Sequence, residues 1–185
     1  MEISMQTKRT FLLGAAATLA APALVRAQTG PAPERNASSF VVQDWRDHFE
    51  TLGNGAILAD ITSRALHFWK PDGSYRLFPS SVPLSEELTR RGYSRIVRKK
   101  VAPSWTPTAS MRERDPSLPL RMEGGPGNPL GTHALYLDWP AYLIHGTHDT
   151  RKIGRQSSSG CIGLYNEHIE SLYGQVEIGT QVRLL

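Results

Sequence analysis

The chain has 185 residues, a formal net charge of +4 and a single cysteine. One cysteine excludes an internal disulfide, and the length suits one domain whose core is large enough to fold without stabilising cross-links. The first 27 residues hold three basic residues and one acidic residue, so half of the net charge lies there. No basic patch interleaved with aromatic residues remains to indicate nucleic-acid binding.

Residues 1–27 have the pattern of an export signal. Lys8 and Arg9 precede an apolar stretch of 15 residues, FLLGAAATLAAPALV, and the segment closes on VRA, which suits a signal peptidase. The run TKRTFLL also resembles a twin-arginine signal, so the general and twin-arginine export routes both stay open. An uncleaved anchor is the alternative, but a spanning helix needs ~20 residues. We expect cleavage, no stable membrane insertion afterwards, and a location in the periplasm or cell envelope.

A domain over 40–185 follows a short linker. Residues 28–39, QTGPAPERNASS, are polar and contain prolines, which predicts a flexible tether. The next segment, AILADITSRALHFWKPDGSYRLFPSSV, holds two strand-like runs and a Pro-Asp-Gly turn at 71–73. Apolar residues alternate from Ile57 onward, so we expect a β-hairpin here.

Strands dominate the rest of the domain. SRIVRKKVAP alternates in the same way, THALYLDWPAYLIHG predicts two short strands broken at Trp139-Pro140, and GTQVRLL predicts a last strand. Only one helix is expected, with Asn166 as its N-cap. Its apolar residues recur at i, i+3, i+4 and i+7 and predict a stripe that packs on the sheet: Ile169, Leu172, Tyr173 and Val176.

The long segment 103–131, PSWTPTASMRERDPSLPLRMEGGPGNPLG, interrupts this pattern. Its six prolines and its glycine cluster predict neither a regular helix nor a central strand. An irregular stretch of this length inside a compact domain is usually functional or mobile, and we expect it to form a wall of a binding cleft. A disordered insert is the alternative, but the segment carries apolar side chains that favour burial: Trp105, Met111, Leu118, Leu120 and Met122.

Cys161 lies in a polar, glycine-flanked turn, SSSGCIG. A lone cysteine is most often a small buried residue, but an unpaired thiol in an exported protein is either a liability or a reactive group. Backbone N–H groups gathered by such a turn would lower the pKa of the thiol and stabilise an oxyanion. A cysteine nucleophile needs a base, and of six histidines His145 is the candidate, because it ends the apolar run AYLI before Gly146 and Thr147.

These residues resemble a known family. The stretch IHGTHDTRKIGRQSSSGCIGLYN is similar to the core motif of the L,D-transpeptidase (YkuD-type) catalytic domain, His-Gly-Thr, then Ile-Gly, then Ser-x-Gly-Cys-Ile-Arg. PSWTPT, GNPLGTHALYL and ILADITSRALHFW resemble the family pattern in the same order, so the likeness covers about Val42 to the C-terminus. The resemblance implies a mainly β fold, an L,D-transpeptidase-like β-sandwich of mixed sheets with one or two short helices.

The resemblance also implies acyl transfer on peptidoglycan stem peptides by a monomer without cofactor or metal. Cys161 would attack the carbonyl of the third-position diaminopimelate in a tetrapeptide, expel the terminal D-alanine and leave a thioester. His145 would take the thiol proton and later activate the acceptor amine, oriented by the backbone carbonyl of Gly146. The N–H groups of Gly160 and Cys161 would hold the oxyanion. A second stem peptide, a lipoprotein lysine, a free D-amino acid and water all stay open as acceptors.

One departure from the family motif concerns the substrate. Gly163 stands where the family usually has arginine, and a guanidinium there would suit a donor carboxylate. Arg151, Lys152 and Arg155, in the loop before the cysteine, are candidates to replace it. Ser159 also differs from the histidine or arginine of many members, at a position that varies. The expected substrate-binding residues are Ser158, Ser159, Arg151, Arg155 and Trp105.

Two rival functions remain. A former transpeptidase that binds peptidoglycan without turnover is favoured by Gly163 and disfavoured by the retained Cys161 and His145. A zinc hydrolase would use His145, His148 and Cys161 as ligands with an open water site, although a His-x-x-His pair is more often incidental.

Overall fold

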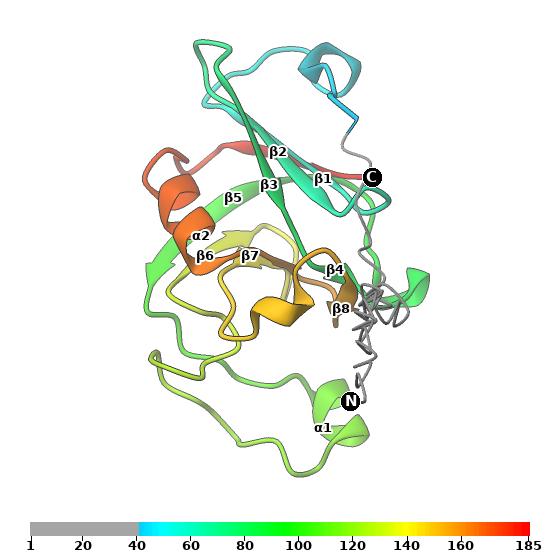
Figure 1. The fold of residues 1–185 in the computed structure, drawn as a ribbon, viewed down its shortest axis with the longest axis vertical. Helices are drawn as coiled ribbons and strands as arrows, with labels where there is room; N and C mark the ends of the chain where they lie inside the picture. The colour runs from blue at the N-terminus through cyan, green and yellow to red at the C-terminus, as the bar shows by residue number, and fades with distance from the viewer. Residues whose placement is uncertain (1–40) are drawn as a thin grey trace, which may run out of the picture. The chain divides into compact units, whose positions relative to one another are not determined.

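The computed structural model describes residues 41–185; the expected signal peptide (1–27) and tether (28–39) lie outside the described residues. The described part is mainly β, with mixed sheets and two short α-helices, as the sequence predicts (Figure 1). Its strands are β1 (Ala56–Asp60), β2 (Ala65–Trp69), β3 (Tyr75–Pro79), β4 (Val82–Pro83), β5 (Gly92–Val101), β6 (His133–Leu137), β7 (Leu143–His145), β8 (Gln156–Ser158), β9 (Ile162–Gly163) and β10 (Gln181–Leu184). Its helices are α1 (Ala109–Arg114), α2 (Asn166–Tyr173) and the single 3-10 turns η1 (Trp45–Asp47), η2 (Glu86–Leu88) and η3 (Thr150–Lys152).

Eight strands form one sheet in the order β3-β2-β1-β10-β5-β6-β7-β9, and β4 pairs with β8. The long strand β5 belongs to both halves of this sheet, because its first residues pair with β10 and its last residues pair with β6. The register shifts between Ile96 and Arg98, where the strand passes from one half to the other. The bend lets the two halves face each other over one core, which is the sandwich expected from the sequence.

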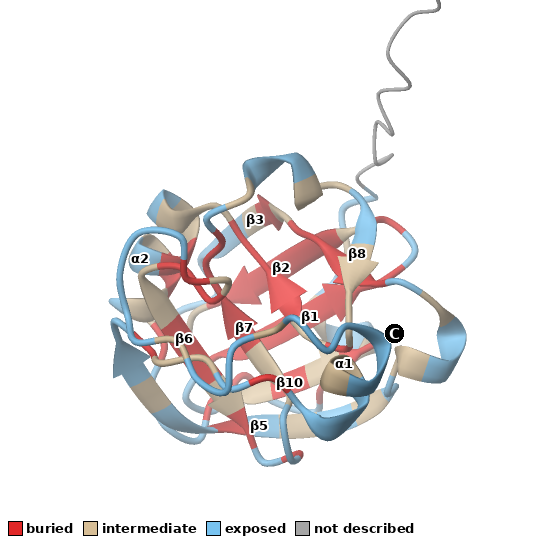
Figure 2. Cartoon of the chain, turned by 90° about the horizontal axis from the view of Figure 1, so that it is seen from below, coloured by how far each residue is buried: buried red, intermediate tan, exposed pale blue. Residues whose placement is uncertain are grey.

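Helix α2 helps to fill that core. It packs on β6 and β7, and Ile169 and Leu172 are fully buried among residues of both halves of the sheet (Figure 2). Val176 is also buried, although the helix ends before it at Gly174. Burying a side chain of this size contributes ~1.5–3 kcal/mol, so the predicted apolar stripe fixes the helix to the sheet.

The predicted hairpin is in fact a three-stranded meander. The Pro-Asp-Gly turn joins β2 to β3, and an additional turn joins β1 to β2. That additional turn is held by Asp60, whose carboxylate accepts hydrogen bonds from the N–H groups of Thr62 and Ser63 at 2.9 and 3.1 Å. Aspartate stabilises turns in this way, so the DITSR run splits what the sequence suggested was one strand.

Asn166 is not the N-cap of α2, contrary to the sequence prediction. The N-cap is Tyr165, and Asn166 is the first helical residue. Its side-chain oxygen instead accepts a hydrogen bond from the N–H of Thr132 at 3.2 Å, and a Cβ added to Gly146 would overlap that oxygen. Asn166 therefore joins the start of α2 to the residue after His145 and to the chain entering β6.

Segment 103–131 contains a helix that the sequence analysis excluded. Helix α1 begins after Thr108, whose hydroxyl accepts a hydrogen bond from the N–H of Met111, and it fits between Pro107 and Pro116. The stems of the segment are paired, because Trp105 and Met122 exchange two backbone hydrogen bonds of 2.7 and 2.8 Å. The segment is thus an ordered part of the domain. Among residues 41–185, no helix has the length and apolar character needed to cross a membrane.

Candidate active site

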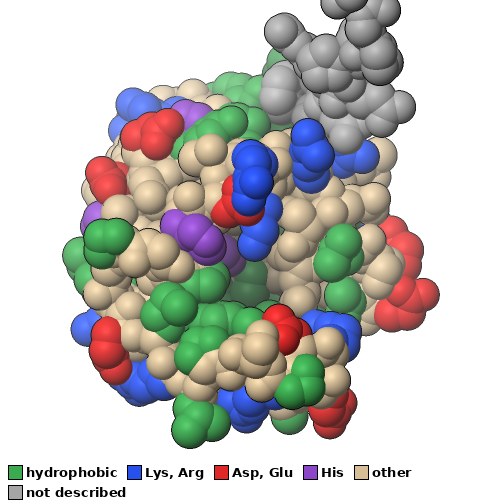
Figure 3. Space-filling view, turned by 60° about the horizontal axis from the view of Figure 1, so that its bottom comes forward, with side chains coloured by type: hydrophobic (Ala, Val, Ile, Leu, Met, Phe, Trp, Pro, Cys, Tyr) green, Lys and Arg blue, Asp and Glu red, His purple; other side chains and the backbone are tan. Residues whose placement is uncertain are grey.

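A cavity of about 500 Å³ lies between segment 103–131 and the loops that follow β7 and β8. The segment supplies an apolar wall, as expected: Trp105, Met111, Leu118, Met122 and Leu130. The opposite side is polar and includes Ser81, Thr147, Lys152, Ser157 and Ser158. Figure 3 shows this hollow with hydrophobic side chains below it and histidine and basic side chains above it.

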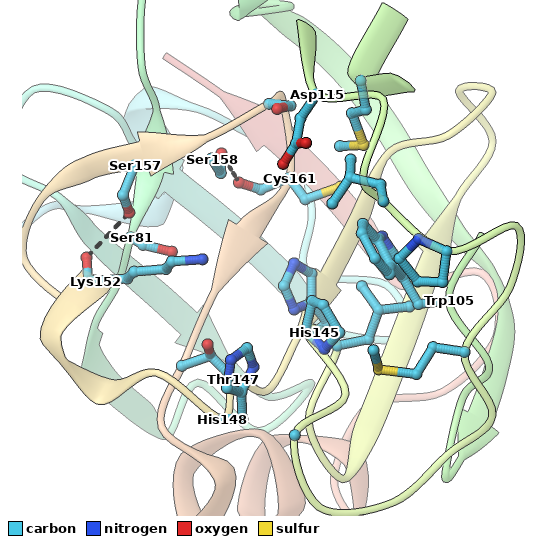
Figure 4. A pocket seen from close by; sticks show the side chains of 18 of the residues that line it. Ser81, Trp105, Asp115, His145, Thr147, His148, Lys152, Ser157, Ser158 and Cys161 are labelled. Atoms are coloured by element: carbon cyan, nitrogen blue, oxygen red, sulfur yellow. Dashed lines mark hydrogen bonds between the residues drawn. The ribbon is translucent and has the colours of Figure 1, made fainter. Parts of the chain in front are cut away.

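His145 and Cys161 both line this cavity (Figure 4). The parallel pairing of β7 with β9 brings them together, since Ile144 pairs with Ile162 and His145 pairs with Gly163. Cys161 directly precedes β9, whereas His145 is the last residue of β7. The sheet therefore unites two residues that lie sixteen positions apart in the chain.

His145 is a buried, oriented and neutral imidazole. Its side chain is 8% exposed, and burial lowers the pKa of the ring to about 4. A hydrogen bond from Nδ1 to the carbonyl oxygen of Gly146, 2.5 Å long, offsets part of this effect. A carbonyl only accepts, so Nδ1 carries the proton and Nε2 keeps its lone pair. The ring is thus prepared to accept a proton at Nε2.

Cys161 is a neutral thiol. Burial raises its pKa to about 11, although a backbone hydrogen bond at Leu143 acts in the opposite direction. The sequence prediction of a lowered thiol pKa is therefore wrong for this state, because desolvation outweighs the nearby N–H groups. The Sγ–H group donates to the carbonyl oxygen of Ala141 at 3.4 Å. At neutral pH the cysteine and the histidine are both uncharged.

Ser158 holds the turn that carries Cys161. Its hydroxyl donates to the carbonyl oxygen of Cys161 at 2.5 Å and accepts a hydrogen bond from the N–H of Gly160 at 3.3 Å. The N–H of Gly160, expected to hold an oxyanion, is therefore engaged within the turn. No acceptor within residues 41–185 takes the N–H of Cys161.

The structure brings only some of the expected substrate-binding residues to the cavity. Trp105, Ser158 and Ser159 line it, whereas Arg151 and Arg155 do not. Arg151 is exposed and ion-paired with the carboxylate of Asp149 at 2.7 Å.

Arg114 and Ser81 are among the cavity residues that sequence reasoning did not single out. Arg114 donates from Nη2 to the hydroxyl of Ser159 at 3.1 Å. Ser81 forms an isolated bridge with Gly163, and its hydroxyl accepts the N–H of that glycine at 3.1 Å. Both residues are distant from the motif in sequence; Arg114 lies in the segment expected to form a cleft wall, but no local pattern singles out either residue. Lys152, named only as a candidate to replace the family arginine, also lines the cavity.

The zinc alternative gains no support from the ligand geometry. Across the described range, 41–185, no three His, Cys, Asp or Glu side chains are close enough together to hold a metal ion. His145 also uses Nδ1 for the carbonyl of Gly146, and His148 is exposed.

Comparisons with known proteins agree with the geometry. The L,D-transpeptidase catalytic domain model (YkuD) matches residues 54–184. The chain is 55% identical over 172 residues to "Putative L,D-transpeptidase in ATP synthase subunits region ORF 5" of Fuscovulum blasticum, covering 92% of this chain and 90% of that protein. It is 35% identical over 142 residues to "Probable L,D-transpeptidase ErfK/SrfK" of Escherichia coli K12, covering 74% of this chain but only 45% of that longer protein.

A solved structure shares the fold. The L,D-transpeptidase LdtMt1, solved in complex with imipenem, superposes with a TM-score of 0.54 at 16% identity, covering 71% of this chain and 59% of that one.

Proposed function

The chain belongs to the L,D-transpeptidase catalytic domain family, and on this premise we propose that it is a peptidoglycan L,D-transpeptidase with Cys161 as nucleophile. The observation that carries the proposal is the shared cavity of Cys161 and His145, with the imidazole oriented by the carbonyl of Gly146. An oriented neutral base beside a thiol is the arrangement that cysteine acyltransfer needs. The export signal expected at 1–27 supports a location in the periplasm or cell envelope, where peptidoglycan lies.

In the first step Cys161 is acylated. Nε2 of His145 takes the thiol proton as Sγ attacks the carbonyl carbon of the third-position diaminopimelate in a tetrapeptide stem. The bond to the terminal D-alanine then breaks, its nitrogen receives the proton from Nε2, and a thioester remains. Because thiol and imidazole are both neutral at rest, the proton moves during the attack and not before it. The thiol must also leave the carbonyl of Ala141.

The oxyanion that forms needs donors. The N–H of Cys161 is free among the described residues, and the N–H of Gly160 becomes available once it leaves the hydroxyl of Ser158. A donor of this kind typically lowers the barrier by ~3 kcal/mol.

In the second step an acceptor resolves the thioester. His145 removes a proton from the acceptor amine, the nitrogen bonds to the acyl carbon, and the C–S bond breaks to restore the thiol. An amine of a second stem peptide gives a 3→3 cross-link, a lipoprotein lysine gives anchoring, and a free D-amino acid gives exchange. Water gives carboxypeptidation through the same thioester.

The test is incubation of the purified protein with tetrapeptide muropeptides, followed by mass spectrometry of the products. We expect release of D-alanine, and the mass of the acyl product identifies the acceptor. Cys161→Ala is the control and should give no product, while circular dichroism verifies its fold. Product formation by that variant would overturn the mechanism.

A peptidoglycan-binding module without turnover is the rival function. Imipenem, the ligand of the related LdtMt1 structure, separates the two. An active cysteine should add the mass of imipenem to the intact protein, and Cys161→Ala should not. Binding of muropeptides with neither acylation nor product would establish the rival.

A further inference from the structure

Ser81 lines the cavity and forms a bridge with Gly163, the strand partner of His145. Strands β7 and β9 pair His145 with Gly163, and residues directly paired in this way present their side chains on the same face. A side chain at position 163 would therefore enter the cavity next to the imidazole, 3.8 Å from its Cε1 atom at the Cβ position. That Cβ would, however, overlap the hydroxyl oxygen of Ser81. A side chain at position 163 would therefore need the hydroxyl of Ser81 to move from its present position, and glycine there supplies no cation.

Lys152 supplies a positive charge from the opposite side. It ends η3 and lines the cavity, and its charge contributes to the low pKa of His145. Figure 4 shows the side chain extended into the pocket with its nitrogen toward His145. Its backbone is fixed, because the N–H bonds to Asp149 and the carbonyl accepts from Arg155 and from Ser157.

The ammonium of Lys152 has no acceptor within residues 41–185, in either an ion pair or a hydrogen bond. The other charged groups of the lining are engaged. Arg114 donates to Ser159, and the carboxylate of Asp115 accepts hydrogen bonds from Ser117. A half-buried cation without a partner in a mostly apolar cavity attracts an anionic group of the ligand.

We propose that Lys152 binds the C-terminal carboxylate of the donor peptide, in place of the arginine that position 163 lacks. The inference rests on the proposed function. His145 must protonate the leaving nitrogen, and in the leaving D-alanine the carboxylate is one carbon away from that nitrogen. A leaving amine at His145 thus carries its carboxylate toward Lys152. Lys152 therefore selects donor peptides in which the residue after the scissile bond carries a free C-terminal carboxylate.

The test compares two synthetic donors that differ at one group, a tetrapeptide ending in D-alanine and the same peptide ending in D-alaninamide. The parent should acylate more efficiently with the acid, by about 10- to 100-fold in kcat/KM, the range of a charge-assisted hydrogen bond. Lys152→Met keeps the apolar stem and removes the charge. Its rate with the acid should fall while its rate with the amide stays the same, so the preference should disappear. Lys152→Arg should restore much of it. Lys100→Met, at an exposed lysine on β5 outside the cavity, is the matched control and should keep the preference.

The ratio between donors isolates the contact with the carboxylate. Removing the charge of Lys152 also raises the pKa of His145, but that change affects both donors equally. Equal rates of the parent on both donors, or an equal loss on both in Lys152→Met, would overturn the inference.

A binding measurement separates this inference from the proposed function. Calorimetric titration of both peptides into Cys161→Ala, with and without Lys152→Met, needs no turnover. Preference for the acid that disappears with Lys152→Met supports the inference even if the parent proves inactive. Turnover by the parent with no such preference would retain the proposed function and reject the role of Lys152.

Discussion

The thiol of Cys161 donates its hydrogen bond to the carbonyl oxygen of Ala141, in the turn before β7, at 3.4 Å. Ala141 has a φ of 62°, an uncommon value for a residue with a side chain, and this conformation is part of the turn that carries the carbonyl. The proton of the Cys161 thiol is thus held on a neutral backbone acceptor and not on the imidazole of His145. The resting pair is uncharged, which sets the pH behaviour of the site.

Acylation by imipenem should be nearly independent of pH between about pH 6 and 9. Burial puts the pKa of His145 at about 4 and that of Cys161 at about 11, so neither group titrates in this interval. The rate should fall as pH drops through about 4, where the imidazole gains a proton and ceases to be a base. Single-turnover acylation followed by mass spectrometry measures the profile, whose apparent constants belong to the coupled pair. A steep rise through pH 6–8 would instead indicate a preformed thiolate–imidazolium pair.

The buried imidazole should also make stability depend on pH. An unfolded histidine gains its proton below about 6.5, whereas His145 in the folded state stays neutral down to about 4. The unfolded state binds more protons in this window, so stability is complete above it and decreases as pH falls, by about 3 kcal/mol in all. His145→Gln should show a correspondingly smaller decrease between pH 7 and pH 4 in urea unfolding. The same loss in both proteins would mean that His145 is not the group responsible.

Of the two histidines at the cavity, only His145 should be needed for turnover. His145→Gln should lose most of the acylation rate because it removes the proposed base Nε2, while His148→Gln should stay close to the parent, since His148 is exposed. Acylation rates with the tetrapeptide donor decide this. Equal losses in the two variants would favour metal ligation after all.

Ser158→Ala should lower kcat about tenfold with little change in KM. The hydroxyl of Ser158 satisfies the carbonyl of Cys161 and holds the N–H of Gly160, so its removal loosens the turn that aims Sγ. A net hydrogen bond is worth ~0.5–1.5 kcal/mol, and the upper end of that range corresponds to a tenfold change. Ser158→Thr keeps the hydroxyl and should recover activity. A change confined to KM would show that Ser158 acts on the substrate and not on the turn.

Gly163→Arg should destabilise the fold without improving catalysis. Its Cβ would overlap the hydroxyl of Ser81, and such overpacking costs typically 1–3 kcal/mol. Gly163→Ala should show a smaller loss by the same contact, and Ser81→Gly should relieve much of it in the double variant. Urea unfolding of Gly163→Ala, of Ser81→Gly and of the variant that combines them gives the coupling energy between the two positions. Strict additivity would exclude the contact between Ser81 and position 163 as the cause.

Local pattern predicted much of the fold and the centre of the site. Alternating residues located β5, β6, β7 and β10, and the spacing of Ile169 and Leu172 located α2. Side-chain hydrogen bonds decided the rest: Asp60 made a turn inside an apparent strand, and Asn166 bonded across to Thr132 and not to its own helix.

The errors in predicting the site have one physical origin. Neither the burial of a residue nor its contacts with distant parts of the chain can be predicted from its neighbours in the sequence. Cys161 was expected to be acidic from its polar turn, but the cavity wall desolvates it and raises its pKa. Ser81 and Arg114 reach the cavity from elements 80 and 47 positions away from Cys161 along the chain. No spacing within the motif encodes those distances.

The side chain of Asn166 connects three parts of the domain that lie behind His145. It fills the space over Gly146 and accepts a hydrogen bond from Thr132, so it links α2 to the start of β6 and to the residue whose carbonyl orients His145. The opposite wall is attached at its stems, where Trp105 and Met122 exchange two hydrogen bonds. Substitutions between those stems therefore leave untouched the hydrogen bonds that orient the imidazole of His145.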